Sequence, residues 1–244
     1  MSRTAVVTGG GSGIGKRVAA RLVEQGTDVV ICGRRADVLE ATADELGRHT
    51  VRPCVLDAAD PHAVAGALDS LPATVDVLVN CAGGNPAWRL PEVPPDDLPG
   101  ISELWLEVLQ ANLLATVMVT TALVPRLADG GRVVNLSSIG VRKGGTAYAA
   151  AKAGIESWTA WMAFQLGERG ITVNAVAPGL VTDTDFYGDA VPLERQAFLV
   201  SQTATKAPAL ADDVASAIVF LTSAESAQIT GQVIAVSGGA DLLR

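Results

Sequence analysis

The chain has 244 residues, of which 49% are hydrophobic, so it can bury a sizeable core, and the disordered and fibrous classes are excluded. Its 18 basic residues against 26 acidic residues give a net charge of −8, which disfavours general binding to nucleic acids or anionic membranes. No linker rich in Pro, Gly or Ser divides the sequence, so we expect one domain spanning residues 1–244.

Short β-rich runs alternate with longer helical patterns along the whole chain. Most strand-like runs are uninterrupted stretches of Val, Ile, Leu and Ala, typical of parallel strands covered on both faces. This alternation predicts an α/β fold, a single Rossmann-type, doubly wound parallel sheet of about seven strands with helices on both faces. The predicted strands are Ala5–Thr8, Asp28–Cys32, Val51–Leu56, Val75–Asn80, Arg132–Leu136, Thr172–Ala177 and Gln232–Val236, and the predicted helices are Gly13–Gln25, Ala36–Leu46, Pro61–Ser70, Ile101–Ala128, Ala147–Glu168 and Ala211–Thr222.

The longest apolar stretch, 113–124, contains three threonines and stops at Pro125. A bilayer-spanning helix needs about 20 apolar residues, so we expect a buried helix here and no membrane partner. No apolar signal region precedes the first strand, which favours a soluble, cytoplasmic protein.

The cysteine and histidine residues give no sign of a disulfide scaffold or a metal site. Cys32, Cys54 and Cys81 each lie in or beside a strand-like run, so we expect core-filling thiols in a reducing compartment, with a redox or nucleophilic role as the alternative. His49 and His62 do not stand in a metal-ligand spacing, and no metal is expected.

Two irregular stretches, 84–100 and 183–208, follow predicted strands and are candidate substrate loops, because ligands of open α/β sheets bind at the carboxyl ends of the strands. Plain surface loops are the alternative. Within the first loop, Arg89 would contact an anionic group or only lie over Trp88. The predicted pocket lining is a mixture of apolar and aromatic residues: Pro86, Trp88, Arg89, Ile139, Gly140, Val141, Phe186 and Tyr187.

A glycine-rich turn joins the first strand to the first helix and has the spacing Gly-x3-Gly-x-Gly over Gly9–Gly15. Glycines allow a tight turn and close approach of the backbone to a pyrophosphate, and a helix N-terminus offers free N–H groups. A purely structural turn is the alternative, but the position at the first strand–helix junction favours a dinucleotide site. The candidate cofactor contacts of this turn are Gly9, Gly11, Ser12, Gly13, Ile14 and Gly15.

The second strand ends in Gly33, Arg34 and Arg35, where an NAD site would carry a carboxylate for the ribose 2′-hydroxyl. Two guanidinium groups favour a 2′-phosphate, so NADP(H) is the predicted cofactor, and a solvated helix entry is the alternative. After the third strand, Asp57 and the adjacent Ala58 are candidate adenine contacts, although Asp57 would equally begin a turn.

Tyr148 and Lys152 stand four residues apart on a predicted helix and therefore share one face. A free tyrosine has a pKa of about 10, and a nearby cation favours its ionised form, which makes it more useful for proton transfer. Ser138 follows the fifth predicted strand, at the carboxyl edge beside that helix. These three side chains indicate a candidate catalytic group.

Six motifs in this order resemble the short-chain dehydrogenase/reductase family over nearly the whole chain, and within it the 3-oxoacyl-acyl-carrier-protein reductase-like ketoreductases. The matching segments are Thr8–Gly15, Asn80–Gly83, Asn112, Ser138, Tyr148 to Lys152, and Pro178-Gly179.

The resemblance implies a role for each matching residue. Tyr148 would be the acid/base that protonates the carbonyl oxygen during reduction, and Ser138 would hydrogen-bond that oxygen. Lys152 would hold the nicotinamide ribose and lower the pKa of the tyrosine, and Asn112 would hold a water that relays protons. The implied cofactor contacts also include Asn80, Ala82, Gly83, Tyr148, Lys152, Pro178, Gly179, Val181 and Thr184.

Three departures from the family pattern stand outside these catalytic residues. Cys81 replaces a more common Asn, the Ser138–Tyr148 separation of ten residues is shorter than in many members, and Thr182 competes with Thr184 for the nicotinamide contact.

The predicted function is therefore an NADPH-dependent oxidoreductase that reduces a ketone, such as a 3-oxoacyl thioester or a biosynthetic intermediate. The alternatives are an NADP-linked dehydrogenase that oxidises a sugar, steroid or cyclic alcohol, and a catalytically silent NADP(H)-sensing protein. The apolar helices 101–128 and 147–168, with Trp105, Trp158 and Trp161, suggest subunit contacts. The resemblance implies a homotetramer, with a dimer as the second choice.

Overall fold

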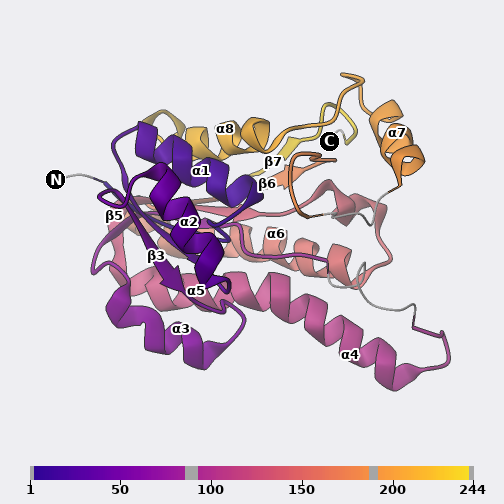
Figure 1. The fold of residues 1–244 in the computed structure, drawn as a ribbon, viewed down its shortest axis with the longest axis horizontal. Coiled ribbons are helices and arrows are strands. Elements are labelled where there is room, and N and C mark those ends of the chain that lie inside the picture. The colour runs from indigo at the N-terminus through magenta and orange to yellow at the C-terminus, as the bar shows by residue number, and fades with distance from the viewer. Residues whose placement is uncertain (1–2, 86–92, 187–191, 242–244) are drawn as a thin grey trace.

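A computed structural model describes residues 3–85, 93–186 and 192–241 (Figure 1). Of the predicted pocket lining, Pro86, Trp88, Arg89 and Tyr187 lie outside these described residues.

Seven parallel strands form one sheet in the order β3-β2-β1-β4-β5-β6-β7, which confirms the predicted doubly wound sheet. The order reverses between β1 and β4, and this is the point at which open α/β sheets bind ligands. The strands are β1 (Thr4–Thr8), β2 (Asp28–Gly33), β3 (Val51–Val55), β4 (Val75–Asn80), β5 (Leu127–Leu136), β6 (Thr172–Pro178) and β7 (Val233–Val236).

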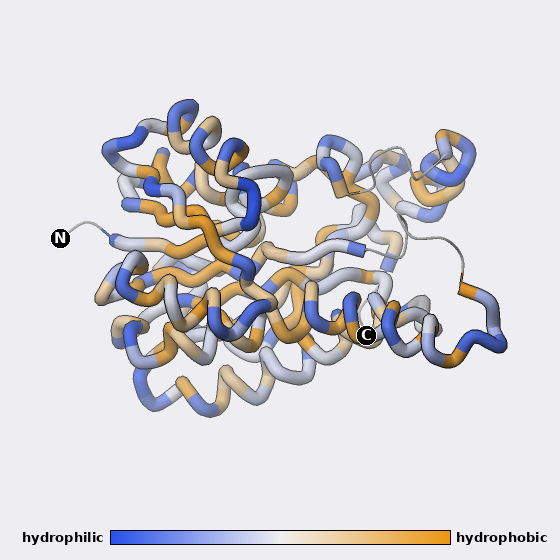
Figure 2. Tube along the Cα trace, turned by 60° about the horizontal axis from the view of Figure 1, so that its bottom comes forward, coloured by the Kyte–Doolittle hydropathy of each residue, from blue (hydrophilic) through white to orange (hydrophobic). Residues whose placement is uncertain are grey.

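Helices cover both faces of the sheet (Figure 1). One face packs against α1 (Gly13–Glu24), α2 (Ala36–Leu46) and α8 (Ala211–Leu221), and the other against α3 (Pro61–Ala67), α5 (Ala115–Leu123) and α6 (Ala147–Leu166). Figure 2 shows hydrophobic segments along the strands between these layers. The remaining helical elements are η1 (Leu68–Ser70), α4 (Leu98–Leu109), η3 (Gln110–Leu114), η4 (Val124–Arg126), η5 (Ile139–Lys143), η6 (Gly167–Arg169), α7 (Leu193–Ser201) and η7 (Ala224–Ser226).

The helical segment predicted over Ile101–Ala128 is present, and the structure differs from the prediction in two details. The helical run contains a π-helical turn, η3, and β5 already begins at Leu127. Pro125 lies in the short 3₁₀ turn η4, where its missing N–H and fixed φ end the helix before the strand.

The stretch 183–208, expected to be irregular, contains helix α7. None of the α7 residues is buried, and Leu193 and Phe198 are exposed. Leu193, Ala197 and Val200 recur at helical spacing, so this segment carries a short helical pattern that the expectation of an irregular loop overlooked.

The helical run Leu98–Arg126 is long and apolar enough to cross a membrane by length and composition alone. Its second half, α5, instead packs on the sheet, where Ala115, Val119 and Leu123 are buried. That packing is typical of a core helix and agrees with the buried helix expected over 113–124.

The glycine turn before α1 yields a direct test of its packing. A Cβ at Gly15 would lie 2.3 Å from the carbonyl oxygen of Gly9, so Gly15→Ala forces the backbone apart, and we expect a loss of about 1–3 kcal/mol in the free energy of unfolding. Urea denaturation measures this loss. The matched control is Gly66→Ala in α3, where a Cβ meets nothing within 4 Å, and which should be neutral or stabilise the chain by up to about 1 kcal/mol. Equal midpoints for Gly15→Ala and the parent chain would contradict the steric argument.

Candidate active site

The predicted site residues gather at the carboxyl edge of the sheet, because β1, β4, β5 and β6 run parallel and end there. Beneath this edge a buried polar chain joins strands to helices. Asn80 Nδ2 donates to Asn135 Oδ1 at 2.8 Å and to Thr120 Oγ1 at 2.8 Å, and Asn135 Nδ2 donates to Thr159 Oγ1 at 2.9 Å. These bonds hold β4 and β5 to α5 and α6, and so fix the ends from which the site is built.

The glycine-rich turn leaves no room for side chains at two of its glycines. A Cβ at Gly9 would lie 3.0 Å from Cys81 and Ala82 backbone atoms. A Cβ at Gly15 would lie 2.3 Å from the carbonyl oxygen of Gly9. Thr8 Oγ1 accepts a hydrogen bond from Ala82 N at 3.0 Å, which ties the turn to the end of β4. The bare backbone at the N-terminus of α1 is the cradle that a pyrophosphate requires, so these residues fit a dinucleotide.

Arg34 and Arg35 follow β2 and are exposed beside this turn. Arg35 Nη2 donates to Ser12 Oγ at 3.3 Å, so one guanidinium already reaches the glycine-rich turn. Asp57 Oδ1 accepts from Ala59 N at 3.0 Å, so the carboxylate does form the turn that was the alternative to an adenine contact. Ala58 is buried next to it.

Tyr148 and Lys152 lie on the first turns of α6, where Thr146 Oγ1 caps the helix by accepting from Ala149 N. Lys152 Nζ lies 5.6 Å from the centre of the Tyr148 ring, so the two side chains do share a face. Lys152 is only 3% exposed, and its Nζ donates to the carbonyl oxygen of Leu136 at 2.8 Å. Burial disfavours the charged ammonium and lowers the pKa of Lys152 to about 8.

Asn112 is fully buried in the π-helical turn η3. Its Nδ2 donates to Gly84 O at 2.7 Å and to Val108 O at 2.9 Å, and its Oδ1 accepts from Gly84 N at 3.2 Å. A Cβ at Gly83 would lie 2.7 Å from Asn112 Oδ1 and 3.4 Å from Lys152 Nζ. Asn112, Lys152 and the end of β4 therefore meet around Gly83, which must stay a glycine.

Ser138 begins the turn η5 after β5, and its Oγ accepts from Gly140 N at 3.0 Å. A Cβ at Gly140 would lie 3.2 Å from Ser138 Oγ and 3.9 Å from Tyr148 Cε1, so the serine and tyrosine border the same small space. The Phe186 ring lies 5.9 Å from the Tyr148 ring, tilted by 53°. Of the predicted lining, Gly140 and Phe186 therefore lie close to Tyr148.

The segment after β6 closes this edge of the site. A Cβ at Gly179 would lie 3.0 Å from Ser237 Cα and 3.5 Å from Ile139 Cδ1, and Val181 is buried in an isolated bridge with Ala209. Thr184 Cγ2 lies 3.3 Å from where a Cβ of Gly13 would stand, whereas Thr182 is exposed. Within the described ranges, Thr184 Oγ1 is buried without a hydrogen-bond partner, which leaves a polar group free beside the glycine-rich turn.

A carboxylate that sequence reasoning missed supports the Ser138 turn. Glu156 Oε1 accepts from Ser137 Oγ at 2.7 Å, and Glu156 Oε2 lies 3.7 Å from Arg142 Nη1. Arg142 Nε also pairs with Asp241 Oδ2 at 3.0 Å. A lone acidic residue one turn after Lys152, in an otherwise apolar helix, is the signal by which Glu156 could have been found.

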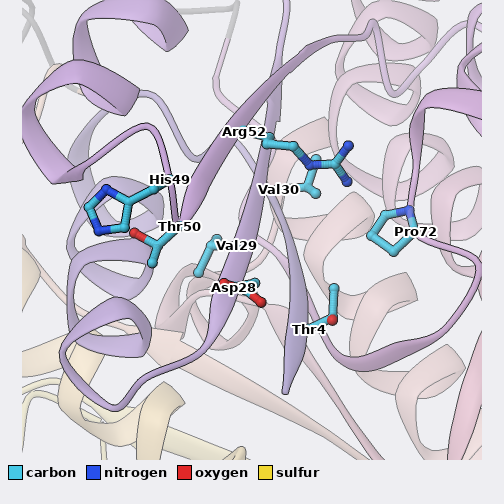
Figure 3. Close-up of a pocket in the computed structure, with 8 residues that line it drawn as sticks. All are labelled: Thr4, Asp28, Val29, Val30, His49, Thr50, Arg52 and Pro72. Carbon is cyan, nitrogen blue, oxygen red and sulfur yellow. The ribbon is translucent and has the colours of Figure 1, made fainter. Parts of the chain in front are cut away.

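A separate pocket of about 310 Å³ lies at the amino ends of β1, β2 and β3 (Figure 3). Figure 3 shows Asp28, His49 and Arg52 around it. The pocket is at the opposite edge of the sheet from Tyr148 and Lys152, so it takes no part in the site described above. In the described part of the chain no cluster of three or more His, Cys, Asp or Glu residues is arranged to hold a metal ion.

Comparison with known proteins agrees with this geometry. The family described as "Enoyl-(Acyl carrier protein) reductase" matches residues 9–241. The (2S)-[(R)-hydroxy(phenyl)methyl]succinyl-CoA dehydrogenase subunit BbsD of Thauera aromatica is 37% identical, with 99% of this chain and 97% of that protein covered. The 3-oxoacyl-[acyl-carrier-protein] reductase FabG of Escherichia coli strain K12 is 31% identical, with 97% and 96% covered.

Two solved structures have the same fold over 98% of this chain. A short-chain type dehydrogenase/reductase from Mycobacterium ulcerans has a TM-score of 0.88, 32% identity and 91% of its own chain covered. A blue fluorescent protein from a metagenomic library, solved in complex with NADPH, has a TM-score of 0.85, 30% identity and 98% of its own chain covered. With a family match over nearly its whole length and relatives above 30% identity, this chain belongs to the short-chain dehydrogenase/reductase family of nicotinamide-dependent oxidoreductases.

Proposed function

We propose that this protein is an NADPH-dependent ketoreductase that reduces the carbonyl group of an acyl thioester or a related biosynthetic ketone. The observation that supports this most is the pairing of Tyr148 with the buried Lys152 on one face of α6, next to the turn that carries Ser138. A cation close to a phenol favours loss of the phenolic proton, which is the step that carbonyl reduction requires of a proton donor.

Each of the three side chains has one role in this proposal. Tyr148 donates its phenolic proton to the carbonyl oxygen as that oxygen gains negative charge. Ser138 Oγ accepts from Gly140 N, which leaves its own O–H to donate to the same oxygen. Lys152 favours the resulting phenolate and holds the ribose hydroxyls of the cofactor.

Asn112 acts as a positioning residue. It holds a water molecule that links Lys152 to solvent and so allows proton transfer to Lys152. Its side chain is fixed by three hydrogen bonds to Gly84 and Val108, and both Asn112 Oδ1 and Lys152 Nζ lie close to Gly83. A proton that leaves Tyr148 is thereby replaced from solvent through Lys152.

NADPH is the cofactor that the residues fit best, and when bound it supplies the hydride. Gly9, Gly11, Ser12, Gly13, Ile14 and Gly15 would hold the pyrophosphate, with Thr184 beside them. Arg34 and Arg35 would pair with the 2′-phosphate, and Ala58 with Asp57 would border the adenine. Asn80, Ala82, Gly83, Pro178, Gly179 and Val181 would line the remainder of the cleft.

The substrate class rests on the relatives. Their names include a 3-oxoacyl reductase and a CoA-ester dehydrogenase, so a thioester carbonyl is the first choice. The family description names an enoyl reductase instead, which makes a C=C bond the second substrate to test. An alcohol dehydrogenase running in the oxidative direction uses the same residues, whereas a silent NADP(H) sensor has no need of Tyr148.

We also expect a cytoplasmic homotetramer, with a dimer as the second choice. On α4 and α6, Trp105, Leu106, Trp161 and Phe164 are exposed although they are large and apolar, which supports burial of this face against another subunit.

The first prediction from the proposed function concerns Tyr148. With a short 3-oxoacyl thioester, NADPH oxidation followed by absorbance should be rapid, and Tyr148→Phe should lower kcat by about 10²–10⁴-fold while NADPH still binds. An enoyl thioester and a cyclic ketone serve as parallel substrates. Undiminished kcat in Tyr148→Phe would exclude Tyr148 as the proton donor. Turnover of the enoyl thioester alone would show that the enzyme reduces a C=C bond and not a ketone.

The second prediction concerns the cofactor. Arg34→Asp should raise the Kd of NADPH about 10–100-fold and leave that of NADH within about twofold, because a charged hydrogen bond is worth about 1.5–3 kcal/mol. Fluorescence titration gives both constants. Arg52→Asp makes the same charge change near the amino end of β3, away from the carboxyl ends of the strands, and should leave both constants unchanged. Equal losses for the two cofactors would show that Arg34 does not meet the 2′-phosphate.

The third prediction concerns Lys152. Its folded-state pKa of about 8 lies below the ordinary value of 10.5, so the unfolded chain holds this proton more tightly. Lys152 therefore destabilises the folded apoprotein below about pH 8, and its contribution to stability rises between about pH 8 and the unfolded pKa. NMR titration of lysine-labelled apoprotein, with Lys152→Met to assign the signal and surface Lys16→Met as control, should give a midpoint near pH 8. A midpoint at the ordinary value would show that burial does not perturb this ammonium.

A further inference from the structure

Two cysteines face each other across neighbouring strands and take no part in the site described above. Cys32 on β2 and Cys54 on β3 are register partners in a parallel pair, so their side chains lie on the same face of the sheet. Both are free thiols, each shifts the pKa of the other, and they are 1% and 7% exposed. Single cysteines often fill a core, but a directly opposed pair can also react.

We propose that Cys32 and Cys54 form an oxidation site, in which a hydroperoxide such as hydrogen peroxide converts the two thiols into a reversible disulfide.

The backbone geometry allows this bond. Neighbouring strands lie about 4.8 Å apart, which is within the Cα separation of about 4.4–6.8 Å that disulfides span. The sulfur atoms must still approach to about 2.05 Å. β3 is the edge strand of the sheet and is paired only with β2, so it can shift toward β2 without breaking a second ladder. A disulfide that needs such a shift is readily reduced again, so the site should be reversible.

The two thiols differ in the way that a stepwise oxidation needs. Interaction with the Cys32 side chain lowers the pKa of Cys54 to about 7, with a further contribution from the charge of Arg52, while interaction with Cys54 and burial raise the pKa of Cys32. Cys54 is also the more exposed of the two. Cys54 is therefore the thiolate that meets the oxidant, and Cys32 is the resolving thiol.

The electrons and atoms balance in two steps. The Cys54 thiolate attacks one peroxide oxygen, the O–O bond breaks, and the released hydroxide takes up a proton as water, which leaves a sulfenic acid on Cys54. Cys32 sulfur then attacks the Cys54 sulfur, the S–O bond breaks, and the second hydroxide leaves as water with the Cys32 proton. The peroxide is reduced by two electrons, and the two thiols are oxidised to the disulfide.

This site borders the proposed NADPH pocket, and its effect on the cofactor rests on that proposed function. Cys32 is followed directly by Gly33, Arg34 and Arg35, and Cys54 lies three residues before Asp57. Drawing β2 and β3 together moves the ends of both strands, where the arginines and the adenine contacts begin. The disulfide should therefore weaken NADPH binding.

The test starts with the whole, reduced protein treated with hydrogen peroxide and then trapped with an alkylating reagent under denaturing conditions. Mass spectrometry should find the loss of two hydrogens, one remaining alkylated thiol, and full recovery of three thiols after dithiothreitol. Cys54→Ala and Cys32→Ala should each abolish the cross-link. Cys81→Ser should keep it, because burial raises the pKa of Cys81 to about 12 and Cys81 follows the end of β4, outside the paired residues of β2 and β3. Three alkylated thiols in the treated parent chain, or a cross-link that disappears in Cys81→Ser, would overturn the proposal.

A second measurement separates this inference from the proposed function. The Kd of NADPH should rise about tenfold in the oxidised protein and return after reduction, with no such rise in peroxide-treated Cys54→Ala. A disulfide with unchanged NADPH affinity would overturn the coupling to the cofactor. Failure of the reduced protein to bind NADPH would contradict the proposed cofactor and would leave the mass measurement as the test of the disulfide.

Discussion

The hydrogen bond between Asn80 and Asn135 is the interaction on which the candidate active site, at the carboxyl ends of the strands, depends. It joins the last residue of β4 to β5 in the dry interior of the sheet, and it continues through Thr120 and Thr159 into α5 and α6. Buried amide N–H groups without partners are costly, so these hydrogen bonds from Asn80 Nδ2 and Asn135 Nδ2 specify one relative position for the four elements. The Asn80–Gly83 turn, the Ser138 turn and the Tyr148 helix are all positioned by elements that it connects.

Burial of the Lys152 ammonium group costs free energy in this arrangement. Lys152 is buried, its ammonium group donates to the Leu136 carbonyl oxygen, and burial lowers its pKa to about 8. Such a group is expensive for the folded apoprotein, but it can exchange protons near physiological pH and places positive charge beside the Tyr148 ring. Perturbed groups of this kind are typical of functional sites, where stability is exchanged for reactivity.

Parallel pairing also brings together residues that the sequence separates widely. Register between β2 and β3 sets Cys32 opposite Cys54, and the segments that follow these two strands carry Arg34 and Asp57. The adenosine side of the proposed cofactor pocket and the thiol pair are therefore parts of one small structural unit at the edge of the sheet. Any movement of the edge strand β3 acts on both.

The sequence by itself determined the sheet class and the glycine turn, because apolar runs and glycine spacing are local patterns. A four-residue separation on a helix singled out Tyr148 and Lys152, whereas Asn112 and the roles of the proposed catalytic residues came from the resemblance of six motifs to the family. Tertiary structure alone decided the π-helical turn at Asn112, whose amide bonds to Gly84 far along the chain. It likewise decided the support of Ser137 by Glu156 and the pairing of Cys32 with Cys54. The contacts of Asn112, Glu156 and Cys32 join segments that lie apart in the sequence, so they leave no periodic signal in the order of residues.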